Sequence, residues 1–199
     1  TIKIEPNYTI RGCVYTPELR QICAKAELEY GFAEMRIISA PELYGGKICA
    51  ALDRQHPRDL FDIQGLLLSK ERDAELVHGF LAMLLGHNRP IHELLNPQRK
   101  IQSEIFEKEF VGMTDTDFSY QDHVQTFEAL IQFVQHEIQS YKGFLLDFVS
   151  LKPDFPSLGI PNLDRMPAIR WKLQNLDKLR KNNPGKFNEQ YDRLTELLL

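Results

Sequence analysis

The stretch SAPELYGGKICAALDRQHPRDLFDI, residues 39–63, decides most of the fold. Ser39 with Glu42 three residues later is the pattern of a capping box, and Pro41 is tolerated in the first turn of a helix. We therefore expect a helix that begins after Ser39 and runs to about Asp53.

A second helix is expected directly after the first. Pro57 disfavours helical geometry at the residue before it, so the chain should leave the first helix within Arg54–Pro57. Beyond this break the apolar residues recur three and four positions apart, which is typical of one buried helix face. They are Leu60, Ile63, Leu66 and Leu67. The second helix should begin near Arg58 and end near residue 68.

The residues before this helix pair favour β-structure. Residues 2–15 alternate between apolar and polar side chains, which predicts a strand. A second short strand is expected over residues 33–38, and residues 17–30 fit a short helix that Gly31 closes. The chain opens with Thr1 in the middle of the alternating pattern, so we expect a fragment of a longer protein.

Everything after residue 70 has the spacing of helices. The expected spans are 73–87, 98–110, 119–138, 140–150, 167–182 and 186–198. Residues 152–167 contain four prolines and are the best candidate for a linker. The predicted fold class is α+β and predominantly helical, with a first domain over residues 1–70 and a helical domain over residues 71–199.

The composition is that of an ordinary globular protein. The 199 residues are 43% hydrophobic, and 24 Lys and Arg against 28 Asp and Glu give a net charge of −4. This balance argues against a broad basic surface for nucleic acid. The three cysteines form no CxxC pair, and no apolar run approaches the ~18 residues of a membrane span. Because the first residues also lack a secretory signal pattern, we expect a cytoplasmic protein without a membrane partner.

The helix pair also carries the residues best suited to chemistry. Lys47 is surrounded by small residues, so its ammonium could reach a bound phosphate; the alternative is an ordinary surface lysine. The helix dipole explains an acidic residue at Asp59, but it explains Asp62 less well. These carboxylates could hold Mg²⁺ or position an attacking hydroxyl. A plain cluster of salt bridges that ties the two helices together is an equal alternative.

Residues 39–63 resemble the AbiEii nucleotidyltransferase toxin family, in which a helix with a lysine precedes an Arg-Asp-aromatic-Asp run. Here Lys47 and the sequence RDLFD at residues 58–62 supply this pattern. The sequence KIE at residues 3–5 is similar to the family's strand motif, and residues 167–176 are similar to the closing helix of some members. The resemblance implies a DNA polymerase β-like nucleotidyltransferase, here the remnant of its sheet followed by an α-helical C-terminal domain.

The resemblance also implies roles for individual residues. Lys47 would contact the phosphates of the nucleotide, and Asp62 would be an essential carboxylate of the catalytic site. Glu5 could present a third acidic group and could bind a metal ion. Arg58 and Asp59 would support the start of the second helix and the nucleotide site.

One element of the family pattern is absent from this sequence. The family carries, upstream of these motifs, a Gly-Ser turn and an Asp-x-Asp pair that binds the metal ions. Because phosphoryl transfer needs such carboxylates, we expect Mg²⁺ to serve the intact protein and expect this fragment alone to be inactive or nearly so. Asp115 and Asp117 have the same spacing, but no strand pattern surrounds them. We interpret residues 112–119 as a loop that caps the helix after Ser119.

The function that the resemblance implies is transfer of a nucleotide from an NTP to a tRNA or a protein acceptor, by the toxin of a toxin–antitoxin pair. An antitoxin would then be a partner. The competing hypothesis is a non-catalytic helical module that binds another protein, or a degenerate member of the family. In that case Lys47 and Asp62 would be structural, and exposed apolar surface would favour a homodimer.

Overall fold

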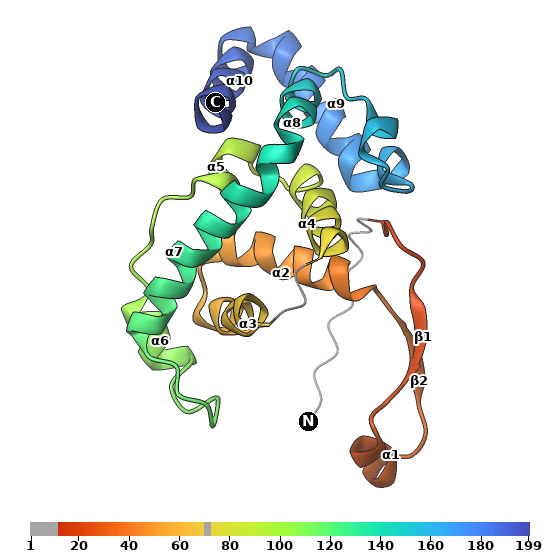
Figure 1. Cartoon of the computed structure of the whole chain (residues 1–199), viewed down its shortest axis with the longest axis vertical. Helices are drawn as coiled ribbons and strands as arrows, with labels where there is room; N and C mark the ends of the chain where they lie inside the picture. Colours follow the sequence, from red (N-terminus) through yellow and green to blue (C-terminus); the bar gives the residue numbers. More distant parts are fainter. Residues whose placement is uncertain (1–11, 70–72) are drawn as a thin grey trace.

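A computed structural model of the chain describes residues 12–69 and 73–199. Most of its elements are helices, and a two-stranded hairpin projects from the helical body (Figure 1). The predicted class, α+β and predominantly helical, is confirmed. None of the helices in the described part of the chain has the length and apolar character that crossing a membrane requires.

The hairpin consists of strands β1 (Glu18–Gln21) and β2 (Glu34–Ile37), with helix α1 (Ala24–Tyr30) in the connection between them. The strands are antiparallel, with Glu18 opposite Ile37. Every residue of the two strands is exposed, and α1 has no buried residue. The hairpin therefore adds little to the core of the molecule.

The sequence predicts the second strand and a short helix that Gly31 closes with a φ of 85°, but residues 18–21 of the expected helix form β1 instead. The expected strand over residues 2–15 lies largely outside the described residues, and its described end forms no strand. There, Val14 and Tyr15 donate their backbone N–H groups to the Glu42 carboxylate at 2.6 and 3.3 Å. Since these groups are occupied, the partner of β2 is a later segment of the chain.

Helices α2 (Ala40–Arg54) and α3 (Pro57–Leu68) confirm the predicted helix pair. Ser39 caps α2, and its side chain accepts the backbone N–H of Glu42 at 3.4 Å. Gln55, in the left-handed conformation with a φ of 57°, turns the chain from one helix into the next. Ser39 at the start of α2 and Pro57 at the start of α3 are the local signals that place these helix boundaries.

Helix α4 (Ala74–Leu85) packs closely against α2, and each helix contributes a glycine to the contact. A Cβ atom on Gly45 would lie 2.4 Å from the carbonyl carbon of Gly79, so no side chain fits at either position. Large apolar side chains such as Leu52 and Phe80 are buried in the core around this contact. Close backbone approach thus fixes α2 against α4.

Helices α5 (Ile91–Leu95) and α6 (Ser103–Glu109) correct the prediction for this region. The sequence misses α5 and begins the next helix at Gln98, five residues too early. The side-chain amide of Gln55 donates to the carbonyl of Gln98 and accepts the N–H of Lys100, at 2.7 Å each. Because Gln55 satisfies backbone groups that a helix would use, residues 98–102 form no helix.

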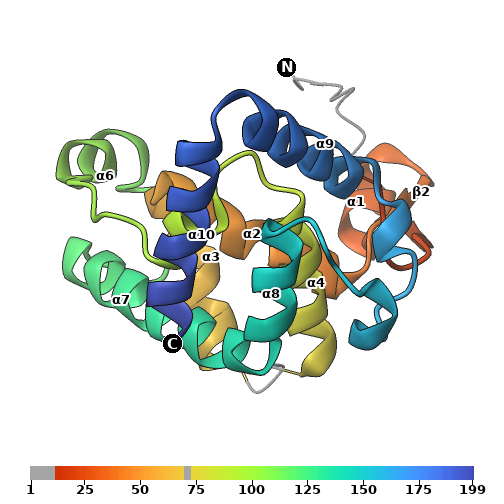
Figure 2. The ribbon, with the colours of Figure 1, turned by 90° about the horizontal axis from the view of Figure 1, so that it is seen from above.

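The remaining helices confirm their predicted spans to within two residues, and α10 packs against α8 and α9 (Figure 2). The last helices are α7 (Tyr120–Glu137), the 3-10 turn η1 (Ile138–Tyr141), α8 (Lys142–Val149), α9 (Pro167–Asn182) and α10 (Pro184–Leu198).

The proline-rich segment over residues 152–167 contains two 3-10 turns, η2 (Phe155–Leu158) and η3 (Leu163–Arg165). The side chains of Ile160 and Met166 are buried in the core, so the segment packs against the helical body. The division at residue 70 stays a prediction.

A buried lysine joins α9 to the turn that follows α4. Lys172 is only 6% exposed, and its ammonium donates to the carbonyls of His87, Asn88 and Arg89 at 2.8, 3.4 and 2.5 Å. Burial lowers the pKa of Lys172 to about 8. This contact ties the C-terminal helices to the core.

Candidate functional site

Lys47 on α2 and Asp62 on α3 meet at the surface and form an ion pair between Nζ and Oδ2. Their side chains are 34% and 42% exposed, so a ligand from solvent can reach both groups. The two residues thus converge in space as the sequence leads us to expect. Their chemical roles stay predictions.

A second ion pair links the same two helices. Arg54, at the end of α2, donates to Oδ1 of Asp59 on α3 at 2.7 Å. The Asp59 side chain is 15% exposed, and its Oδ2 is buried without a hydrogen-bond partner among the described residues. The interface of α2 and α3 therefore holds two carboxylates, each beside a cation.

A groove of about 720 Å³ runs along this face of α2. It is lined by Lys47, Arg54 and Asp59, with Ala50 between the two cations and Gly46 directly before Lys47. A Cβ atom on Gly46 would meet nothing within 4 Å, so this glycine borders open space. The groove can therefore admit a ligand beside the positive groups.

Arg58 and Glu5 are not brought to this groove by the described residues. The Arg58 guanidinium reaches α6 instead, where it donates to the carbonyl of Glu109 at 3.3 Å. Asp62, four residues after Arg58, pairs with Lys47 rather than with this arginine. Glu5 lies outside the described residues. The roles that the family resemblance implies for Arg58 and Glu5 stay predictions.

The described residues do not form a magnesium site. Among residues 12–69 and 73–199, no group of three or more His, Cys, Asp or Glu side chains is placed to hold a metal ion. Asp62 and Asp59 each face a cation, which competes with a metal ion for the carboxylate. The involvement of Mg²⁺ therefore stays a prediction.

The Asp-x-Asp sequence in the 112–119 segment is part of a loop, as expected. Asp115 and Asp117 are exposed, and α7 begins just after them. Ser119 and Asp122 form a full capping box at the start of α7. The hydrogen bonds from Ser119 lower the pKa of the Asp122 carboxyl.

The sequence alone does not reveal what holds the corner between α2 and α3. The last carbonyls of a helix have no partner within it, and here three successive carbonyls accept hydrogen bonds from side chains of other elements. The donors are Lys100 Nζ to Asp53 at 2.7 Å, Gln102 Nε2 to Arg54 at 2.8 Å and His123 Nε2 to Gln55 at 3.0 Å. These contacts join residues more than 40 positions apart, so no local pattern predicts them.

His123 is the most buried of these donors, at 3% exposed. Because the carbonyl of Gln55 only accepts, Nε2 of His123 carries the proton, and Nδ1 is buried without a hydrogen-bond partner in the described part of the chain. Burial is the main cause that lowers the pKa of His123. The imidazole is therefore held in its neutral form.

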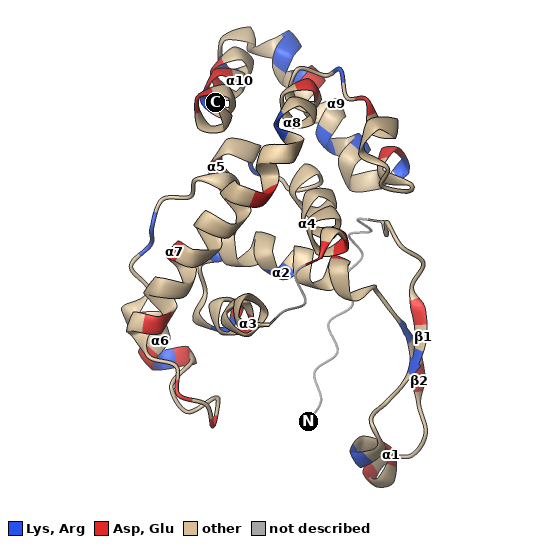
Figure 3. Cartoon of the chain, in the orientation of Figure 1, with Lys and Arg blue, Asp and Glu red and all other residues tan. Residues whose placement is uncertain are grey.

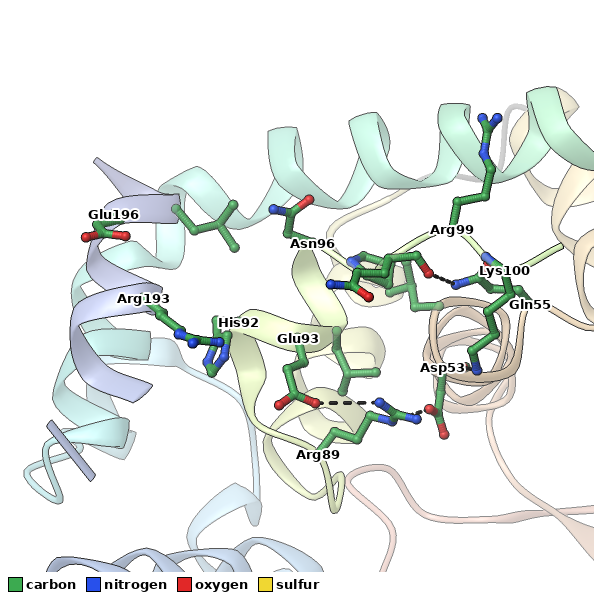
Figure 4. Close-up of a pocket in the computed structure, with 15 residues that line it drawn as sticks. Asp53, Gln55, Arg89, His92, Glu93, Asn96, Arg99, Lys100, Arg193 and Glu196 are labelled. Carbon is green, nitrogen blue, oxygen red and sulfur yellow. Dashed lines mark hydrogen bonds and ion pairs between the residues drawn. The ribbon is translucent and has the colours of Figure 1, made fainter. Parts of the chain in front are cut away.

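A second cavity of about 700 Å³ lies on the other side of this corner, between the end of α2, α5, the segment after α5, and α10 (Figure 4). Arg89 sits between Asp53 and Glu93 and is paired with both (Figure 4). The other cations of the lining are Arg99, Lys100 and Arg193. Elsewhere Lys and Arg are interspersed with Asp and Glu on most helices (Figure 3).

Comparison with protein families gives one match. A family model described as "Nucleotidyl transferase AbiEii toxin, Type IV TA system" matches residues 1–175. Neither the curated proteins nor the solved structures gave a match.

Proposed function

Because the chain belongs to the AbiEii nucleotidyl transferase toxin family of type IV toxin–antitoxin systems, we propose that its Lys47 groove binds the phosphates of an NTP. A hydroxyl oxygen of an RNA or protein acceptor then bonds to the α-phosphorus of the NTP, the bond from this phosphorus to the bridging β-phosphate oxygen breaks, and pyrophosphate leaves. The convergence of Lys47 and Asp62 on an open face is the observation that carries this proposal.

The ion pair is suited to an exchange of partners. A triphosphate is a stronger anion than one carboxylate, so it draws the Lys47 ammonium away from Asp62. Because the pair is partly exposed, breaking it costs little free energy. The released Asp62 carboxylate is then free to accept a hydrogen bond from the attacking hydroxyl and to orient it.

Mg²⁺ is part of the proposal, and when bound it would neutralise charge on the phosphates during transfer. Because the described residues form no cluster of three or more metal-binding side chains, we propose that acidic groups outside them contribute to its ligands. Glu5 keeps its proposed role as an acidic group of the site.

An RNA acceptor is supported by the second cavity. Arg99 and Lys100 on the segment after α5 and Arg193 on α10 are cations of its lining, and Asn96 supplies an amide for a base edge. Arg99 is paired with Glu128 and Arg193 with Glu189, so a phosphate backbone would bind there by exchange with these exposed carboxylates. A tRNA is therefore the first acceptor to test, and a protein hydroxyl is the second. The family context adds an antitoxin partner and a cytoplasmic setting to the proposal.

The decisive experiment measures transfer of label from [α-³²P]NTPs to total tRNA and to protein, with Mg²⁺, by the protein as its gene encodes it. We expect labelled product from the native protein and at least a 100-fold loss of rate in Lys47→Ala and in Asp62→Asn. Arg170→Ala, at an exposed arginine of α9 outside the groove, serves as a control for loss of a surface cation. If both variants transfer nucleotide at the native rate, the proposed roles of Lys47 and Asp62 are wrong.

The exposed hairpin favours a second candidate function, binding of another protein. Leu28 is 90% exposed, and Tyr30, Phe32 and Met35 are each more than 60% exposed. Such a surface is typical of a protein interface, including that of a homodimer. Light scattering on the native protein and on a Tyr30→Ser/Met35→Ser variant tests this. A change of mass between them supports the interface, whereas monomers in both reject the homodimer.

A further inference from the structure

We propose that Arg54 is a second phosphate-binding cation of the Lys47 groove and that Asp59 positions it. This inference rests on the proposed function, because it adds a residue to the same nucleotide site. Arg54 is not among the residues to which the resemblance to the AbiEii family gives a role.

The first argument is the shared face of α2. Lys47 and Arg54 are seven residues apart, which is close to two full turns and puts them on one side of the helix, about 10.5 Å apart along its axis. Ala50 lies between them and Gly46 lies directly before Lys47, so small residues line the groove beside both cations. Two long cationic side chains can therefore approach one polyphosphate chain from its two ends.

The second argument is the state of the Arg54 guanidinium. One of its nitrogens donates to Asp59 at 2.7 Å, and its other N–H groups have no partner among the described residues. A guanidinium carries five N–H donors and matches phosphate oxygens in pairs. Arg54 can thus keep Asp59 and still bind a phosphate, whereas the Lys47 ammonium has to be released from Asp62.

The third argument concerns Asp59. Its carboxylate is mostly buried at the helix interface, so it has little freedom to move. By accepting from Arg54 it holds a side chain that is itself 63% exposed over the groove. Asp59 therefore acts through Arg54 as a positioning residue.

Arg58 provides the contrast. It is the same residue type four positions later, but its guanidinium contacts the carbonyl of Glu109 at the end of α6 and does not line the groove. If only the amount of positive charge mattered, Arg54 and Arg58 would contribute equally to phosphate binding. Their geometry differs, because Arg54 lines the groove and Arg58 does not.

The test is equilibrium binding of ATP, GTP, CTP and UTP, and of inorganic tripolyphosphate, to the native protein and its variants by calorimetry. We expect Arg54→Ala to weaken binding of the preferred NTP about tenfold or more, the usual cost of losing a charge-assisted hydrogen bond. Arg54→Lys should recover part of the affinity, and Arg170→Ala, which removes an exposed arginine of α9 outside the groove, should stay within about twofold of native. Thermal unfolding of each variant verifies that the protein is folded.

Asp59→Asn tests the positioning role. We expect it to weaken binding less than Arg54→Ala does, and to add nothing in the double variant, because Asp59 acts only through Arg54. Additive losses in the double variant would overturn this role.

The outcomes separate the inference from the proposal beneath it. If Lys47→Ala weakens binding but Arg54→Ala does not, or if the control variant Arg170→Ala weakens it equally, the role of Arg54 is refuted while the nucleotide site stands. If the native protein binds neither NTP nor tripolyphosphate, both ideas are refuted.

Discussion

The two faces of helix α2 differ in how tightly they are packed. On one face Gly45, Ala51 and Leu52 are buried against α4 and the core. On the other, Gly46 and Ala50 border an open groove. Small residues are present on both faces, but on the first they allow two backbones to touch and on the second they leave room for a ligand. The same residue types therefore serve stability on one face and binding on the other.

The adjacent glycines give the largest expected difference. Gly45→Ala should destabilise the protein by about 3 kcal/mol, because its Cβ atom would lie within 2.5 Å of the Gly79 backbone and would force α2 away from α4. Gly46→Ala should instead raise stability by about 0.5–1 kcal/mol, since alanine is the better helix former and meets no neighbour. Urea unfolding of the two variants measures both values. Equal effects would show that the two faces do not differ as described.

The stability of the protein should depend on pH through His123, which lies at the corner between α2 and α3. The lowered pKa of His123 means that, below its ordinary value of about 6.5, the unfolded chain takes up a proton that the folded protein does not. Stability should therefore be complete above pH 7 and should fall as the pH drops through 6.5. His123→Gln keeps an amide donor for the Gln55 carbonyl but does not titrate. The unfolding midpoint in urea, measured from pH 7.5 to 5, should fall less for this variant than for the native protein; parallel curves would exclude His123 as the cause.

The smallest effect on stability is expected on the groove face. Lys47→Met and Asp62→Asn should each change the free energy of unfolding by less than about 1 kcal/mol, because partly exposed ion pairs contribute little. The same unfolding measurements test this. A loss of several kcal/mol would show that the pair mainly ties α2 to α3, which is the structural alternative.

The sequence predicts well what local chemistry decides. Ser39, Pro57 and the apolar spacing of α3 place the helix pair to within a few residues, and Ser119 marks the start of α7. It predicts poorly what distant partners decide. No local signal shows that Glu42 takes the N–H groups of Val14 and Tyr15.

The candidate site follows the same division. Lys47 and Asp62 can be chosen from their spacing on two consecutive helices, and the structure brings them together. The difference between Arg54 and Arg58 cannot be predicted from spacing, since it depends on the partner of each guanidinium. Arg54 contacts Asp59 on α3, whereas Arg58 contacts the carbonyl of Glu109 on α6. Short-range geometry thus identifies the groove, and tertiary packing decides which cations line it.

The buried ammonium of Lys172 provides a chemical probe for local opening of the C-terminal helices. With a pKa of about 8, a substantial fraction of this amine would be uncharged and nucleophilic in mildly alkaline buffer. Three backbone carbonyls and its burial nevertheless shield it from reagents while α9 is docked. Slow acylation of this one side chain, read by mass spectrometry against the fast labelling of surface lysines, would therefore time how often the C-terminal helices lift from the rest of the molecule.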